Sequence, residues 1–236
     1  MSDALTLVQT VQAALGERAR QGRPLPTPII CPPFISLVPL RGLMDRALLR
    51  LGAQNCHWEA AGAYTGEIST TMLQDLVDYV MVGHSERRAA GETDDQVARK
   101  VAAVVRAGLV PILFVGEQEP TDDASRQSEQ QLTEGLSRID PRNQPVVVVY
   151  EPVWAVGAEQ AADPEHVRRE VERLKEQLGR LGASRPEVIY GGTVNDQNID
   201  QFAELDVLDG VGATRASLDP RRFVDLLDRI ATRTGA

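Results

Sequence analysis

Two residues that can move protons stand at the ends of strand-like apolar runs in distant parts of the sequence. His84 follows the run 79–82, and Glu151 follows the run 146–150. If the chain alternates strands and helices, the strands are parallel and their carboxyl ends meet at one rim of the sheet. A carboxylate can accept a proton and an imidazole can donate one. The pattern therefore predicts a proton-transfer site at that rim.

Composition favours a single domain that occupies residues 1–236. The chain has 236 residues, 42% of them apolar, and barrels of alternating strands and helices often reach this size as one unit. Its net charge of −9 argues against nucleic acid and anionic membranes as partners. No apolar run reaches the ~20 residues that span a bilayer, and the N-terminus lacks the pattern of a secretory signal. We therefore expect a cytoplasmic protein.

The two cysteines, Cys31 and Cys56, are isolated in the sequence and lie outside any Cys-x-x-Cys pattern. This usage predicts reduced thiols rather than a disulfide framework or a structural zinc site.

The order of apolar runs predicts a parallel sheet. An amphipathic helix starts at Ser2 and stops at Gly22, and seven strand-like runs follow it, each succeeded by a helical stretch: 28–31, 51–54, 79–82, 110–115, 146–150, 188–190 and 207–212. The runs are continuous rather than alternating, as in strands that are covered on both faces. Such a sheet either stays open and doubly wound or closes as an eight-stranded barrel. No Gly-x-Gly-x-x-Gly follows an early strand, so a (β/α)8 barrel that lacks its first strand fits better.

The segment from Glu117 to Gln131 is more polar than its neighbours, although Leu132 and Leu136 lie behind it. This pattern predicts a solvated helix with its entry loop rather than disorder.

Seven segments, in order and spacing, resemble the triosephosphate isomerase family. They are Cys31-Pro32-Pro33-Phe34, Gly52-Ala53-Gln54-Asn55, Gly62-Ala63-Tyr64-Thr65-Gly66-Glu67, Val82 to Arg88, Tyr150 to Gly157, Tyr190-Gly191-Gly192-Thr193-Val194 and Ala216-Ser217-Leu218. The resemblance implies a (β/α)8 barrel, usually a homodimer, that interconverts dihydroxyacetone phosphate and glyceraldehyde 3-phosphate. It also implies catalysis without a metal or an organic cofactor, and a place in glycolysis and gluconeogenesis.

Within this resemblance, each polar residue near the two strand ends receives a role. Glu151 is the candidate base, which a closing loop could desolvate and so make more basic. His84 is the candidate electrophile, and the helix that begins at Ser85 would favour a neutral ring that donates one hydrogen bond, the role established for triosephosphate isomerases. Glu86 and Arg87 are expected to support these residues through an ion pair that orients the loops.

The expected phosphate end of the site departs from the family pattern. Gly157, Gly191, Gly192 and Thr193 match turns that bring backbone N–H groups to the phosphate. Glu159 stands where a lid-tip glycine is usual, and Thr214 and Arg215 replace two glycines. Arg215 either contacts the phosphate through a charge-assisted fork or fills the space that a triose phosphate would use.

Two further features concern the first strand and the partner. The family's first strand carries an asparagine and a substrate-binding lysine, whereas this chain begins within or just before the first helix. Either the sequence starts too late, or the barrel is truncated and catalysis is impaired. The loop from Trp58 to Glu67 resembles the family loop that enters a partner subunit, with Thr65 touching the partner's active site.

Three functions remain open from the sequence. The first is a triosephosphate isomerase, and the second is an isomerase of another phosphorylated sugar, such as a tetrulose phosphate, accommodated by the altered lid and Arg215. The third is a barrel that binds phosphorylated metabolites without catalysis.

Overall fold

The computed structural model describes residues 2–120, 122–158 and 160–233. Its strands are β1 (Ile29–Ile30), β2 (Arg50–Ala53), β3 (Tyr79–Val82), β4 (Val110–Val115), β5 (Val147–Tyr150), β6 (Glu187–Tyr190) and β7 (Gly210–Val211). Its α-helices are α1 (Ser2–Arg20), α2 (Leu37–Arg41), α3 (Thr70–Leu73), α4 (Ser85–Ala89), α5 (Asp94–Arg106), α6 (Asp122–Leu136), α7 (Pro164–Arg180), α8 (Ile199–Ala203) and α9 (Pro220–Arg233). Three short 3₁₀ turns, η1 (Phe34–Ser36), η2 (Val153–Ala155) and η3 (Arg215–Leu218), follow β1, β5 and β7.

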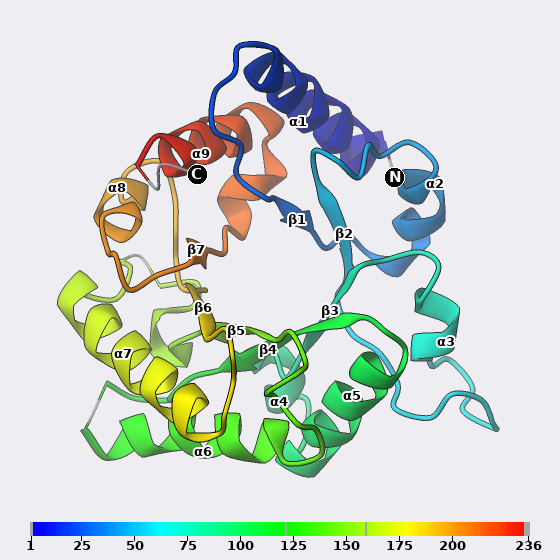
Figure 1. The fold of residues 1–236 in the computed structure, drawn as a ribbon, viewed down its shortest axis with the longest axis vertical. Coiled ribbons are helices and arrows are strands. Elements are labelled where there is room, and N and C mark those ends of the chain that lie inside the picture. Colours follow the sequence, from blue (N-terminus) through cyan, green and yellow to red (C-terminus); the bar gives the residue numbers. More distant parts are fainter. Residues whose placement is uncertain (1, 121, 159, 234–236) are drawn as a thin grey trace.

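The strands of the described residues form one parallel sheet in the order β1-β2-β3-β4-β5-β6-β7. The sheet curls around a central axis and the helices form a ring outside it (Figure 1). Within the described part of the chain, β1 and β7 are the two edges of the sheet, and the packed pair α1 and α9 covers the outside of the gap between them (Figure 1). The predicted (β/α)8 barrel, incomplete at its first strand, is thereby confirmed.

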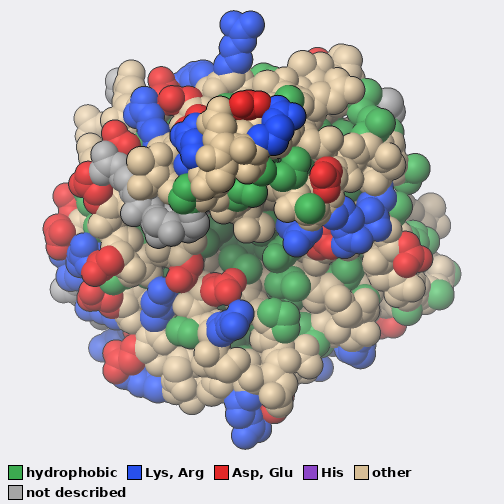
Figure 2. Space-filling view, turned by 45° about the horizontal axis from the view of Figure 1, so that its top comes forward, with side chains coloured by type: hydrophobic (Ala, Val, Ile, Leu, Met, Phe, Trp, Pro, Cys, Tyr) green, Lys and Arg blue, Asp and Glu red, His purple; other side chains and the backbone are tan. Residues whose placement is uncertain are grey.

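Both faces of the strands are buried, as their continuous apolar runs predicted. Alternate residues point outward and pack beneath the helices, for example Leu113 of β4 and Val148 of β5. The residues between them form a second cluster inside the curl, namely Ile112, Phe114, Val147 and Val149. A face of the molecule is hollowed at its centre and has hydrophobic side chains in the hollow (Figure 2). The inside of the curled sheet is therefore packed with apolar side chains.

The long helices begin and end where their sequences predict. Thr93 makes a capping box with Gln96 at the start of α5, and the Asp163 side chain accepts from two backbone N–H groups at the start of α7. Gly108 and Gly182 follow these helices with φ of 74° and 89°, a conformation that side chains with a Cβ rarely adopt. These signals fix where each chain segment turns back into the sheet.

The polar stretch 117–131 is an entry loop followed by the first part of α6, as predicted, but the expectation that it is solvated is wrong for its inner face. Glu117, Ser128 and Gln131 are buried. Gln131 accepts a hydrogen bond from the backbone N–H of Gly116, and the Ser128 hydroxyl donates to Glu117. These polar groups are buried because each has a partner, which offsets the loss of water.

Both thiols are free, as predicted: Cys56 is buried and Cys31 partly buried, and burial raises the pKa of each to about 12. None of the described helices is long and apolar enough to cross a membrane.

The first and last helices are joined by a buried cation. The guanidinium of Arg18 on α1 is 4% exposed, pairs with Asp228 on α9 and also donates to the carbonyl of Pro24. The Asp228 carboxylate is 48% exposed, so part of its charge remains hydrated. This ion pair holds α1 against α9 beside the open edge of the sheet.

Replacing Arg18 with alanine should lower the free energy of unfolding by about 2 kcal/mol, because it removes a buried ion pair of which one member is half hydrated. Urea unfolding at neutral pH measures this loss. Arg20, exposed on the same helix and paired with Glu17, is the matched control, and its alanine variant should lose no more than about 0.5 kcal/mol. Equal losses in the two variants would contradict this account of how α1 is held.

Candidate active site

The two residues singled out at the strand ends meet at the carboxyl rim of the sheet. Glu151 follows β5 directly, and His84 lies two residues beyond the end of β3. The Nε2 atom of His84 is 3.1 Å from Oε1 of Glu151. The sequence predicted that these two groups share a rim, and the structure brings them into direct contact.

Local backbone geometry fixes the orientation of the His84 ring. His84 is the N-cap of α4, and its Nδ1 accepts the backbone N–H of Glu86 at 3.3 Å. Because Nδ1 is an acceptor, the ring hydrogen is on Nε2, which faces Glu151. The ring also packs against Phe114, with centroids 4.8 Å apart. This arrangement suits a neutral imidazole that donates from Nε2.

Glu151 is a buried carboxylate whose hydrogen-bond donors come from the segment after β3. It is 3% exposed, and its Oε2 accepts the backbone N–H of Ser85 at 2.9 Å. Burial raises the pKa of Glu151 above its ordinary value of 4.5, whereas the neighbouring His84 and the Ser85 hydrogen bond act in the opposite direction. A raised pKa makes the ionised carboxylate a stronger base.

Two glycines leave room for Glu151. A Cβ at Gly116 would lie 1.8 Å from the carbonyl oxygen of Glu151, a distance that no side chain can occupy. A Cβ at Gly191, in the turn after β6, would lie 2.4 Å from Val149 and 3.7 Å from the Cβ of Glu151. The strands on both sides of β5 thus approach the base closely because these positions carry no side chain.

The segment 153–162, here called the lid, begins in a buried polar network. The carboxylate of Glu117 accepts from the Trp154 indole at 2.9 Å and from the Tyr150 hydroxyl at 2.7 Å. Nε2 of His166 lies 2.9 Å from the Tyr150 hydroxyl and 3.4 Å from Glu117. Burial and the nearby Glu117 raise the pKa of Tyr150, so its hydroxyl stays protonated and can donate. Glu117 therefore anchors the first turn of the lid.

Sequence reasoning missed this network. Its one usable signal was that Glu117 stands two residues after the strand-like run 110–115, as His84 stands two residues after 79–82. The polar composition after Glu117 hid that signal, because it favoured a solvated loop.

Two further lid residues, Ala155 and Ala162, are bound to the end of β6 and the turn after it. The backbone N–H of Ala162 donates to the Tyr190 hydroxyl at 3.2 Å, and the Thr193 hydroxyl donates to the carbonyl of Ala155 at 2.9 Å. A Cβ at Gly192 would lie 2.0 Å from the Tyr190 hydroxyl oxygen, so only glycine lets that hydroxyl reach the lid. Hydrogen bonds therefore hold the lid near both of its ends.

The residues expected at a phosphate end gather around the lid. Arg215, the first residue of η3, donates from Nη2 to the carbonyl of Gly157 at 3.0 Å, and Gly157 has a φ of 69°. Thr214 precedes Arg215 and is exposed. Gly191, Gly192 and Thr193 form the neighbouring turn. Glu159 lies outside the described residues.

The other predicted site residues lie on the surface of the single chain. Glu86 and Arg87 are exposed, and neither side chain forms an ion pair with another described residue. The ion pair of this segment is instead made by Arg88, which binds Asp94 and donates to the carbonyl of Gly83.

Thr65 and Glu67 are also exposed, in the loop that projects outside the ring of helices before α3 (Figure 1). The role expected for this loop is toward a second subunit.

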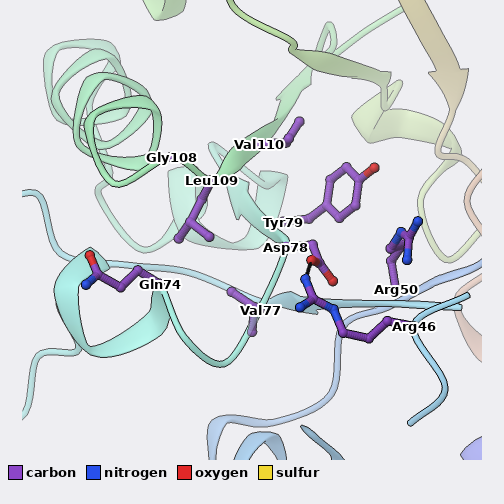
Figure 3. A pocket seen from close by; sticks show the side chains of 9 residues that line it. All are labelled: Arg46, Arg50, Gln74, Val77, Asp78, Tyr79, Gly108, Leu109 and Val110. Carbon is purple, nitrogen blue, oxygen red and sulfur yellow. Dashed lines mark hydrogen bonds and ion pairs between the residues drawn. The ribbon is translucent and has the colours of Figure 1, made fainter.

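A second hollow lies at the opposite rim. It has a volume of about 510 Å³, and its walls include Arg46, Arg50, Asp78 and Tyr79 at the amino ends of β2 and β3 (Figure 3). Arg46 turns toward Asp78 and forms an ion pair with it (Figure 3). Among the described residues, no group of three or more His, Cys, Asp or Glu side chains is placed to hold a metal ion.

A parallel barrel that holds a buried carboxylate, an adjoining imidazole and a tethered lid at its carboxyl rim is typical of enzymes that transfer protons. Comparison with known proteins identifies the family within this class. The model of the family described as triosephosphate isomerase matches residues 1–230. The chain belongs to the triosephosphate isomerase family.

Individual relatives cover most of the chain. Triosephosphate isomerase of Dehalococcoides mccartyi is 39% identical over 239 residues, which cover 98% of this chain and 92% of that protein. The enzyme of Nostoc punctiforme is 41% identical over 217 residues, covering 90% and 86%. That of Aquifex aeolicus is 38% identical over 207 residues, covering 84% of each chain.

Burial of the Glu151 charge should cost stability at neutral pH. The folded-state pKa of Glu151 is raised, so its contribution to stability is fully present below 4.5 and is lost as the pH rises through the raised value. Glu151→Gln, which carries no charge, should therefore melt at a higher temperature than the wild type at pH 7. Calorimetry should show this difference shrinking as the pH falls toward 4.5. A variant that melts lower at pH 7 would show that the hydrogen bonds of the carboxylate outweigh its desolvation.

Proposed function

We propose that this protein interconverts dihydroxyacetone phosphate and glyceraldehyde 3-phosphate through an enediolate. The contact between His84 Nε2 and Glu151 Oε1 under the lid carries this proposal, because it places a base and a hydrogen-bond donor within reach of one small substrate. The names of the relatives give the substrate class.

In this mechanism, Glu151 removes a proton from the carbon next to the carbonyl. The electrons of that C–H bond form a carbon–carbon double bond, and the carbonyl π electrons move to its oxygen, which gives the enediolate. Nε2–H of His84 donates to the substrate oxygens where negative charge develops. Glu151 then returns the proton to the neighbouring carbon, while a hydroxyl proton moves between the two oxygens. To act on substrate, the carboxylate must exchange at least one of its present donors, Ser85 N–H or His84, for the substrate.

The phosphate of the substrate is proposed to lie between the lid and the turns after β6 and β7. The residues assigned to it are Gly157, Gly191, Gly192, Thr193, Thr214 and Arg215. Their support is the pair of hydrogen bonds from Thr193 and Arg215 to lid carbonyls, which join the lid to the turns after β6 and β7. A closed lid would exclude water from the enediolate. The proposed chemistry needs no metal or organic cofactor.

A homodimer is the proposed assembly. Large apolar side chains are exposed at Ile35, Val38, Tyr64 and Met72, in and beside the loop 58–67 and the short helices α2 and α3. An apolar surface of this kind favours burial against another chain. Thr65 and Glu67 in the projecting loop, together with the exposed Glu86 and Arg87, are proposed to contact the second subunit.

We place the protein in the cytoplasm, in glycolysis and gluconeogenesis, as the phosphorylated triose substrates suggest. Its net charge of −9 supports neither nucleic acid nor membrane as a partner.

The proposal is tested by an isomerase assay with triose and tetrulose phosphates. Glu151→Gln should lower kcat/KM for the triose phosphates about 1,000-fold, because it removes the base. His84→Gln should lower it about 100-fold, because it removes a donor to the developing charge. Glu172→Gln, an exposed substitution on α7, is the control and should match the wild type. Turnover of tetrulose phosphate alone would replace the substrate assignment, and wild-type turnover no higher than that of Glu151→Gln would refute the isomerase.

The pH dependence gives a separate check. The ionised form of Glu151 is the proposed base, and its pKa is raised above 4.5. As the pH is lowered, kcat/KM should therefore fall, with the midpoint of the fall above pH 4.5. A limb at or below 4.5 would contradict the role of a buried base.

A further inference from the structure

Arg215 is the cation that the structure places against the lid. The chain has two lysines, and both are engaged elsewhere: Lys100 pairs with Glu92, and Lys175 pairs with Asp209. Arg222, close to Arg215 in sequence, pairs with Asp196. Arg215 has no carboxylate partner among the described residues, and its side chain is exposed. Within that part of the chain, no carboxylate offsets its positive charge, although the protein carries a net charge of −9.

Among the described residues, the Arg215 side chain forms a hydrogen bond with the lid. Nη2 donates to the carbonyl oxygen of Gly157 at 3.0 Å across 58 residues of sequence. A Cβ at Gly157 would lie 3.2 Å from Nη2, and the φ of 69° there also disfavours other residues. The backbone of the lid thus approaches the guanidinium closely, because glycine stands at the contact.

A guanidinium can hold a carbonyl and an anion at the same time. It has five N–H groups in one plane, and the contact with Gly157 uses Nη2. A carbonyl oxygen carries only partial charge, so the remaining N–H groups can still form charge-assisted, bidentate hydrogen bonds with phosphate oxygens. Thr193, whose hydroxyl donates to Ala155 in the same lid, lies in the turn proposed to bind the phosphate.

We propose that Arg215 is both a ligand of the substrate phosphate and the latch of the lid. Its guanidinium binds the phosphate oxygens while Nη2 holds the Gly157 carbonyl, so phosphate binding and lid closure favour each other. By linkage, each event must strengthen the other by the same factor. This inference rests on the proposed function for the identity of the substrate. It makes Arg215 the residue that gives the enzyme its preference for phosphorylated substrates.

Phosphate binding can be measured without any turnover. Titration calorimetry with inorganic phosphate on the full chain should show binding about 10- to 100-fold weaker in Arg215→Ala, the size expected for a lost hydrogen bond between charged groups. Arg215→Lys should be intermediate, because it keeps the charge and loses the fork. Arg221→Ala, an exposed arginine of α9, is the matched control and should bind as the wild type does. Wild-type affinity in Arg215→Ala would overturn the proposal.

Coupling to the lid needs a kinetic measurement. For glyceraldehyde 3-phosphate, Arg215→Ala should lower kcat/KM at least tenfold, and guanidinium ion at millimolar concentration should restore part of it. For glyceraldehyde, which lacks the phosphate, the same variant should keep its kcat/KM within about twofold. Equal losses on the two substrates would show that Arg215 only supports the fold and would overturn the proposal.

The phosphate titration and the isomerase assay distinguish failure of the Arg215 proposal from failure of the proposed function. Phosphate binding that depends on Arg215 in a chain without isomerase activity would refute the isomerase and keep Arg215 as the phosphate ligand. Isomerase activity with phosphate binding that ignores Arg215 would keep the isomerase and refute the latch.

Discussion

The proposed chemistry depends on a carboxylate that must be ionised although the fold has removed most of its water. Glu151 is 3% exposed, and its charge is stabilised by Ser85 N–H and His84 Nε2. Both donors come from the segment after β3. The orientation of the Glu151 carboxylate is therefore fixed by a neighbouring βα turn rather than by its own strand. The absence of a side chain at Gly116 is equally necessary, because any Cβ there would displace the Glu151 backbone. A few close approaches between adjacent strand ends therefore decide whether this rim can do chemistry.

Much of the fold followed from patterns that are local in the sequence. All seven predicted strands are present, although β1 and β7 are each only two residues long. The continuous apolar runs correctly indicated strands that are buried on both faces. Gly108 and Gly182 correctly indicated helix ends, and both have a positive φ in the structure. The shared rim of His84 and Glu151 followed from parallel topology alone, because every strand end reaches the same side. These features need no knowledge of which helix packs against which strand.

The features that could not be predicted arise between segments. Glu117 looked solvated because its neighbours in sequence are polar, yet α6 turns Ser128 and Gln131 inward and buries it with partners. Arg215 and Gly157 are 58 positions apart, so their contact could not be predicted from the sequence. The sequence left open whether Arg215 contacts the phosphate or fills the space of the substrate. Glu86 was expected to form an ion pair, whereas the single chain leaves it exposed and pairs Arg88 with Asp94. Such contacts depend on tertiary packing, which no local pattern encodes.

Because Tyr150 and Glu151 are adjacent in the sequence, they constrain the evolution of this site together. Successive residues of a strand face opposite sides, so Tyr150 reaches outward to the anchor of the lid while Glu151 reaches inward to the proton-transfer rim. Two adjacent residues therefore carry both the support of the lid and the proposed base. A substitution that shifts the end of β5 alters both at once, and improvement of either must be compatible with the other. Support of the lid and placement of Glu151 therefore cannot vary independently, which restricts the residues that this strand end can accept.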